Sequence, residues 1–123
     1  MDYANGRKNW YFPDCEMPPQ GDEPLKGHES VIILNDNDSA ANICLTLFFT
    51  DREPLDGIHV TIMPGRVRCL RLDNPDDLEG IIIPRETQYA MKLASDMPVM
   101  VQYGRLDTRQ IKMAFYASSG YSY

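Results

Sequence analysis

The sequence predicts an all-β protein, a single-domain antiparallel β-sandwich of jelly-roll-like type over residues 1–123. Several short segments alternate between apolar and polar residues or form brief β-branched runs, which is typical of strands. Turn-forming residues separate these segments about every 8 to 12 residues, as in sandwiches and barrels. A chain of 123 residues is long enough to bury one core and too short for two.

Residues 1–28 are expected to be mostly loop, because proline and glycine recur through them. A short strand is expected near residues 9–12, and it contains the single tryptophan, Trp10. Two roles suit this side chain, a core residue or a flat apolar wall for a ligand. The β-branched run Ser30–Asn35 predicts a buried strand, and the Asn/Asp-rich residues 35–39 predict the turn that follows it.

Three further strands are expected at residues 42–50, 58–63 and 66–72. The dipeptide Pro64-Gly65 separates the last two, so we expect them to form a hairpin. An acidic loop at residues 73–80 and an apolar run stopped by a proline come next.

Residues 87–94 fit a helical stripe or a strand, and we favour a strand because the neighbouring segments are strands. Residues 98–110 form the next segment, and a last strand is expected at residues 111–117. Residues 118–123 are expected to be a flexible tail unless an oligomer holds them.

The segment 98–110 changes character along one face. Val99, Val101 and Tyr103 alternate as the buried side of a strand would, and then charged residues occupy the same parity at positions 105, 107 and 109. An unpaired buried ion costs several kcal/mol, so a core does not accept such charges uncompensated. Either the strand runs into a solvated turn near Gly104, or these charges pair and line a pocket.

Composition narrows the classes of function. The chain is 43% hydrophobic and 24% charged, as ordinary globular proteins are, and its net charge of −6 argues against general nucleic-acid binding. No apolar run approaches the roughly 20 residues of a membrane helix, and the opening residues lack the apolar core of a signal peptide. Three cysteines without metal or redox spacing suit free thiols in a reducing compartment, so we expect a cytoplasmic protein.

Catalytic and metal motifs are not evident. His28 and His59 are the only histidines, and neither lies in a metal-binding motif, so no metal or cofactor is expected. The run His28-Glu29-Ser30 cannot form a triad by itself, because adjacent strand residues point to opposite faces.

Polar and basic side chains on strands are the remaining candidates for chemistry. Arginine binds carboxylates, phosphates and vicinal hydroxyls, and glutamine both donates and accepts hydrogen bonds. Such a set can bind a small polar solute without reacting with it; the alternatives are surface ion pairs, worth under about 1 kcal/mol each, or contacts between protomers. The candidate ligand-binding residues are Trp10, Glu29, Arg66, Arg71, Gln102, Arg105, Asp107 and Arg109.

Residues across most of the chain resemble the soluble sensory rhodopsin transducer family, first known as the cytoplasmic partner of a cyanobacterial sensory rhodopsin. The likeness covers roughly residues 9 to 117, and the run Arg105-Leu-Asp-x-Arg-Gln110 after Val101-Gln102 is its most specific part. The other matching positions are Trp10, Glu29-Ser30, Asn35, Asp51-x-Glu-Pro54, Arg66, Arg71, Ile83-Pro84, Thr87 and Pro98. The acidic loop at 73–80 looks slightly longer than the family's, and the Pro-rich opening and Tyr-rich tail match poorly.

This resemblance implies a β-sandwich, a homotetramer, no enzymatic activity and a role in binding small, sugar-like molecules. The leading hypothesis is therefore a non-enzymatic, small-molecule-binding sensory module that acts as a homo-oligomer. The alternative is a soluble transducer that docks on a membrane photoreceptor or another receptor. A remote third hypothesis is a glycoside-type hydrolase that uses Glu29 and Asp107.

Overall fold

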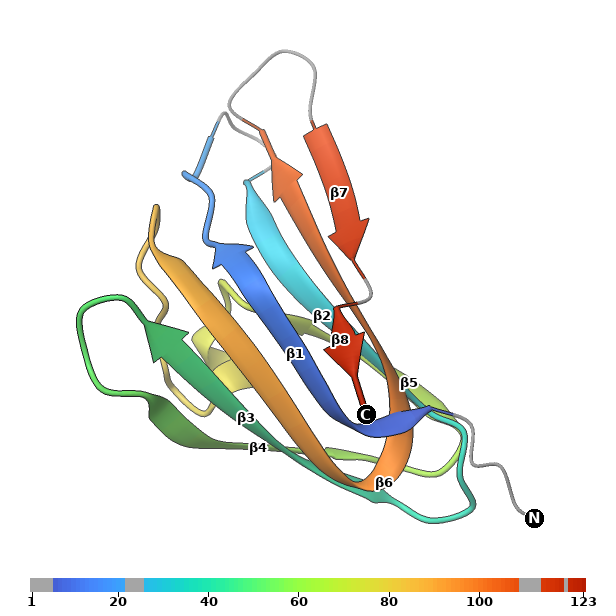
Figure 1. The fold of residues 1–123 in the computed structure, drawn as a ribbon. Coiled ribbons are helices and arrows are strands. Elements are labelled where there is room, and N and C mark those ends of the chain that lie inside the picture. Colours follow the sequence, from blue (N-terminus) through green and yellow to red (C-terminus); the bar gives the residue numbers. More distant parts are fainter. Residues whose placement is uncertain (1–5, 22–25, 109–113, 119) are drawn as a thin grey trace.

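The computed structural model describes residues 6–21, 26–108, 114–118 and 120–123 (Figure 1). All the strand pairs in it are antiparallel. The strands are β1 (Arg7–Glu16), β2 (His28–Asn35), β3 (Ala41–Phe49), β4 (Leu55–Ile62), β5 (Arg66–Arg71), β6 (Gln88–Asp107), β7 (Ala114–Ser118) and β8 (Tyr121–Ser122). The predicted all-β antiparallel sandwich is confirmed.

Strand β6 belongs to both layers. Its first half pairs with β3 and β1 in the sheet β4-β3-β6-β1-β8, called sheet A here. Its second half pairs with β2 and β7 in the sheet β5-β2-β6-β7, called sheet B. Figure 1 shows the sharp bend between the two halves. The pairing with β3 reaches Ser95, and the pairing with β2 begins at Met100, so the bend lies around Pro98.

The core lies between the sheets because each strand alternates. On β2, Val31 and Ile33 face inward, and on β3, Ile43, Leu45 and Leu47 do the same. The favoured strand at residues 87–94 is confirmed as the start of β6, where Tyr89, Met91 and Leu93 are buried. No helix among the described residues has the length and apolar character needed to cross a membrane.

The expected hairpin of residues 58–63 and 66–72 is wrong. Strand β4 pairs with β3 in sheet A, whereas β5 pairs with β2 in sheet B. The turn explains this outcome: Gly65 has a φ of 63° and follows a proline, the arrangement of a type II turn. Type II turns splay the flanking strands, unlike the primed turns that close tight hairpins. Pro64-Gly65 therefore carries the chain from one sheet to the other.

The two ends of the chain contain more strand than expected. Strand β1 covers Arg7–Glu16, where only a short strand at residues 9–12 was expected within a loop. The expected flexible tail instead includes β8, which pairs with β1 through Trp10↔Ser122 and Tyr11↔Tyr121. The apolar run at residues 81–84 is not a strand, and the acidic loop contains the 3-10 helix Pro75–Leu78. Residues 109–113, where the last strand was expected to begin, lie outside the described residues.

Candidate ligand site

Glu29 is a fully buried carboxylate between the two sheets, with 0% of its surface exposed. Its parity on β2 matches that of Val31 and Ile33, so the side chain points into the sandwich. Tyr89 donates from the sheet A half of β6 at 2.6 Å, and Tyr103 donates from the sheet B half. The backbone N–H of Glu16, at the end of β1, donates to the same carboxylate at 3.0 Å. One side chain thus accepts hydrogen bonds from both layers.

Burial controls the protonation of Glu29 and of its neighbours Tyr89, Tyr103 and Cys15. Burial raises the pKa of Glu29 above its ordinary 4.5, because it disfavours the charged form; the hydrogen bonds from the two tyrosines and the charge of Arg105 oppose that rise. Burial and the neighbouring carboxylate raise the pKa of both Tyr89 and Tyr103. The pKa of the buried Cys15 thiol is raised for the same two reasons. The phenols therefore remain donors at neutral pH, and Cys15 remains an unreactive thiol.

A surface hollow of about 190 Å³ adjoins this cluster through Tyr103. The rings of Phe12 and Tyr103 lie 5.8 Å apart between centroids, and Tyr121 is 70% exposed. Asp14 supplies an exposed carboxylate, and the remaining lining residues are Pro13, Ser118 and Gly120. Drug-sized ligands occupy roughly 300–1,000 Å³, so this hollow suits a smaller molecule with an apolar face and polar groups.

Gly120 lets the chain lie close to the aromatic floor of the hollow. Its φ is +66°, and an added Cβ would fall 2.6 Å from both the Phe12 ring and the carbonyl oxygen of Tyr11. Only glycine meets both demands, so this residue fixes how β8 approaches β1 beside the hollow.

The structure brings together two of the predicted ligand-binding residues, Glu29 and Arg105. They are paired across β2 and β6, and Arg105 donates to the carbonyl oxygen of Glu16 at 3.4 Å. Asp107 ends β6 opposite Ala114 and is half-buried. Arg109 lies outside the described residues.

Three other predicted residues lie elsewhere. Trp10 is 8% exposed and its indole N–H donates to the carbonyl oxygens of Arg7 and Val99, at 3.0 and 3.1 Å, so it packs in the core. Gln102 is exposed on the outer face of sheet B, opposite in parity to the inward Tyr103. Arg66 pairs with Asn35 at the far end of β5, five residues along that strand from Arg71, which pairs with Ser30.

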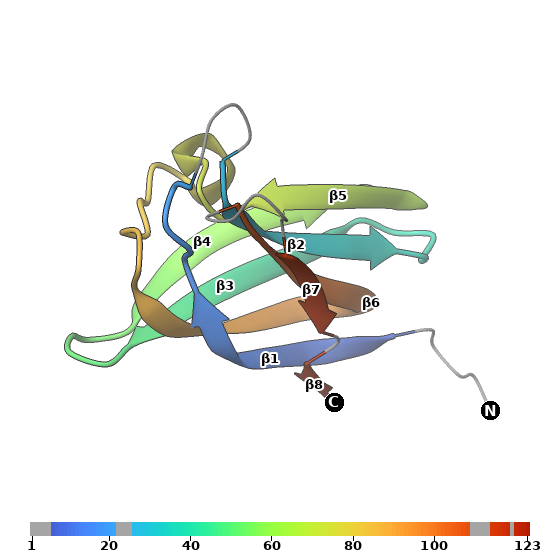
Figure 2. The ribbon, with the colours of Figure 1, turned by 90° about the horizontal axis from the view of Figure 1, so that it is seen from above.

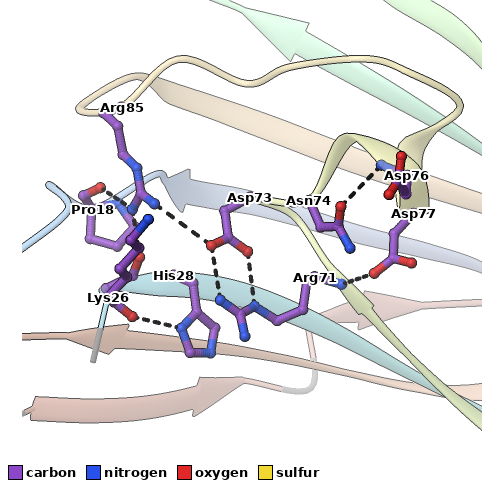
Figure 3. A network of polar contacts seen from close by, with 10 residues as sticks. Pro18, Lys26, His28, Arg71, Asp73, Asn74, Asp76, Asp77 and Arg85 are labelled. Carbon is purple, nitrogen blue, oxygen red and sulfur yellow. Dashed lines mark hydrogen bonds and ion pairs between the residues drawn. The ribbon is translucent and has the colours of Figure 1, made fainter. Parts of the chain in front are cut away.

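Arg71, the last predicted residue, belongs to a polar network over the end of sheet B (Figure 3). Its guanidinium donates two hydrogen bonds to Asp73, at 2.8 and 2.9 Å, and Arg85 forms an ion pair with the same carboxylate at 3.6 Å. Arg85 also donates to the carbonyl oxygens of Pro18 and Gly27. The network ties the loop after β5 to the segments that flank β2, and the guanidinium of Arg71 is already occupied by Asp73.

Sequence reasoning missed the partners of Glu29 and the walls of the hollow. The inward parity of Glu29 was an available signal, because a carboxylate among buried residues requires hydrogen-bond donors. The identity of those donors was not available, since Tyr89 and Tyr103 lie 60 and 74 residues away in sequence. No group of three or more His, Cys, Asp or Glu side chains suited to a metal occurs within the part of the chain that the structure describes.

A second candidate surface is the outer face of sheet B. Leu34 lies between Val67 and Met100 in the pairing of β5, β2 and β6, and these three side chains are 38%, 63% and 39% exposed. Phe115 on β7 is 70% exposed and pairs with Leu106. A hollow of about 180 Å³ is lined by Ile32, Leu34, Met100, Val101 and Gln102. We call this surface the apolar face of sheet B.

Comparison with known proteins identifies the family. The family model described as "Anabaena sensory rhodopsin transducer" matches residues 5–122. The chain belongs to this transducer family. The match includes the opening and the tail that seemed to depart from the family pattern, and no curated protein sequence matches the chain.

Two solved structures resemble the transducer-family fold seen here. One, described as "Crystal Structure of Thermotoga maritima 1070", is 33% identical, covers 97% of both chains and has a TM-score of 0.86. The other, described as "Anabaena sensory rhodopsin transducer", is 31% identical, covers 82% of this chain and 99% of its own and has a TM-score of 0.71. The chain is therefore a sensory rhodopsin transducer-like module.

Proposed function

We propose that this chain is a non-enzymatic cytoplasmic sensory module that binds a small polar, sugar-like ligand and acts as a homotetramer. The observation that carries the proposal is the position of Tyr103. Tyr103 lines the 190 Å³ hollow, and its hydroxyl donates to the buried Glu29. A ligand in the hollow would touch a residue whose other end helps to join the two sheets.

The lining of the hollow fits a polyhydroxy compound. Aromatic faces pack against the C–H groups of a sugar ring, and a carboxylate accepts hydrogen bonds from adjacent hydroxyls. Tyr121, which is 70% exposed, supplies the open aromatic face above the buried Phe12, and Asp14 supplies the carboxylate. Arg105, one of the predicted binding residues, pairs with Glu29 across β2 and β6, and its charge favours the ionised form of Glu29.

The same geometry counts against the remote hydrolase hypothesis. Glycosidases place two carboxyl groups, roughly 5 to 9.5 Å apart, on either side of a bond in an open cleft. Glu29 is fully buried and engages three donors, so it does not face a cleft.

Equilibrium binding to a panel of monosaccharides, polyols and organic acids tests the proposal by titration calorimetry. Asp14→Asn should weaken the best binder about tenfold, because hydrogen bonds to a charged acceptor are the stronger ones. Asp38→Asn, in the exposed turn after β2, is the matched control. The absence of any binder below about 10 mM contradicts the ligand-binding role.

The apolar face of sheet B supports self-assembly. A stable interface buries about 800 Å² on each partner, and a face built from four strands offers a continuous surface for it. Two self-complementary contacts of this kind generate a closed tetramer.

Docking on a membrane receptor is the second candidate, and the same exposed apolar face favours it. Light scattering on the purified chain separates the two. A monomer in solution, with Met100→Lys reducing capture by the cytoplasmic loops of a retinal receptor, supports docking; a tetramer supports self-assembly.

A further inference from the structure

The strands on either side of the Pro64-Gly65 turn diverge and leave a wedge between them. Strand β4 is the edge of sheet A, and β5 is the edge of sheet B. Figure 2 shows both strands on the side of the molecule away from β1. The wedge contains a hollow of about 340 Å³, lined by Thr61, Ile62, Met63, Arg66, Val67 and Arg68.

The β5 side of the wedge has a free backbone edge. Among the described residues, β5 pairs with no strand other than β2, so the first part of its other side offers backbone N–H and C=O groups for pairing. At the end of that edge, the N–H of Arg71 already donates to Asp77 and its C=O accepts from Asn74. A small ion cannot pair with a row of backbone N–H and C=O groups, whereas an extended segment can pair with it as a further strand. The backbone of β5 therefore favours a peptide over a small solute.

The side chains along this edge are basic. Arg66 and Arg68 are exposed and share one face of β5, because they are two residues apart. Within the described residues neither forms an ion pair, although the chain as a whole carries a net charge of −6. Val67, which is 63% exposed, lies between them and points to the opposite face.

We propose that the wedge binds an extended segment of a partner protein with acidic residues at alternate positions and an apolar residue between them. The backbone of the segment pairs with the edge of β5. Its two acidic side chains lie over Arg66 and Arg68, and the apolar residue between them lies beside Val67. This site is separate from the aromatic hollow, and the inference is independent of the ligand binding proposed there; Val67 also belongs to the apolar face of sheet B.

A second folded copy of this chain does not supply the segment. The described residues contain two acidic–apolar–acidic triplets, at 14–16 and 77–79. Their middle residues, Cys15 and Leu78, are both 0% exposed. Each triplet is thus committed to its own core, so the segment belongs to a different chain.

Fluorescence anisotropy tests this site with a labelled ten-residue peptide in which Glu alternates with Val and Thr. Two matched peptides are its controls, one with Lys in place of Glu and one N-methylated at alternate backbone positions. Only the first peptide should bind, because the second reverses the charge and the third removes the ladder hydrogen bonds. Raising the salt concentration should weaken its binding.

Variants of the protein locate the site. Arg66→Glu/Arg68→Glu should weaken the Glu peptide at least about tenfold. Arg52→Glu, which reverses an exposed arginine in the loop before β4, should change the affinity less than about twofold. Circular dichroism of each variant confirms its fold. Equal binding of the Lys or N-methylated peptide, equal binding by the double variant, or no binding of the Glu peptide up to about 1 mM overturns the proposal.

Discussion

Tyr89 donates a hydrogen bond of 2.6 Å to Glu29 and so joins the sheet A half of β6 to β2 in sheet B. Tyr103, fourteen residues further along the same strand, donates to the other oxygen of that carboxylate. The interior of the sandwich therefore contains one acceptor that specifies how the two layers face each other. Buried polar groups of this kind are costly unless each is satisfied, and here the three donors satisfy it.

Glu29→Gln should destabilise the protein by about 1–3 kcal/mol at neutral pH, because the amide NH₂ would face a donor and leave a buried group unpaired. Urea unfolding measures the change. Glu86→Gln, at an exposed position, is the control and should leave the unfolding midpoint unchanged. An unchanged midpoint for Glu29→Gln would show that the carboxylate does not specify the interior.

The pH dependence of stability should carry a signature of Glu29. Its folded pKa is raised above the ordinary 4.5, so its contribution is most favourable below that pH and declines as pH rises through the raised value. The free energy of unfolding of the native protein, relative to Glu29→Gln, should therefore fall as pH rises from about 4.5. A relative stability that rises over this range would contradict the assignment.

The pH dependence of stability that Asp73 contributes should have the opposite sign to that of Glu29. Burial opposes its ionisation, but the guanidinium of Arg71 outweighs this and lowers its pKa below 3.8. Its contribution is present above the unfolded pKa and is lost as pH falls through the folded value. Asp73→Asn should cost about 1 kcal/mol at pH 7, a modest figure because Arg71 is 42% exposed, and the deficit should vanish in acid. Thermal unfolding between pH 2 and 7 measures it, with Asp38→Asn as control.

Asn35 should be the most sensitive polar residue at the opposite end of the sandwich. It is fully buried, and its amide donates to the carbonyl oxygens of Ser39 and Ile62, both at 2.9 Å. Its own oxygen accepts from the side chain of Asn37, which in turn donates to Pro98 at the bend of β6. Asn35→Ala should cost about 2–3 kcal/mol in urea unfolding, because it leaves several buried groups unpaired. Ser39→Ala, which keeps the backbone acceptor, should cost under about 0.5 kcal/mol.

Charge on the apolar face of sheet B should dissociate the proposed homotetramer. Leu34→Glu/Met100→Glu places two carboxylates at the centre of that face, where desolvation disfavours them. Light scattering should then give a mass below that of four chains. Gln88→Glu, exposed at the start of β6, should leave the mass unchanged. A double variant that retains the native mass would place the interface elsewhere.

The sequence predicts the strands of this fold because their pattern is local. The continuous β-branched run of β2 and the alternation along β3 are both readable in a window of eight or nine residues, and the alternation places Ile43, Leu45 and Leu47 on the inward face, where they are buried. The pairing of strands is harder to predict from the sequence. Pro64-Gly65 indicates a hairpin turn, although a turn of its type sends β4 and β5 to different sheets.

The candidate site was harder to predict because its parts come from distant segments. Phe12 and Tyr121 lie at opposite ends of the chain, and pairing of β1 with β8 brings them to one hollow. Arg105 was named from residue type and parity, and Glu29 without the use of its parity; their adjacency depends on the pairing of β2 with β6. Trp10 was ambiguous, because the backbone acceptors of its N–H are visible only in the folded chain.

The late position of β6 governs how this chain can be made. During synthesis β1 emerges first, yet both of its partners, β6 and β8, lie after residue 87. Until then only the ribbons β2–β5 and β3–β4 can form, and isolated two-stranded ribbons are marginal in water. Neither sheet can therefore be completed until the final third of the chain appears, and until then its apolar strands lack the partners that bury them.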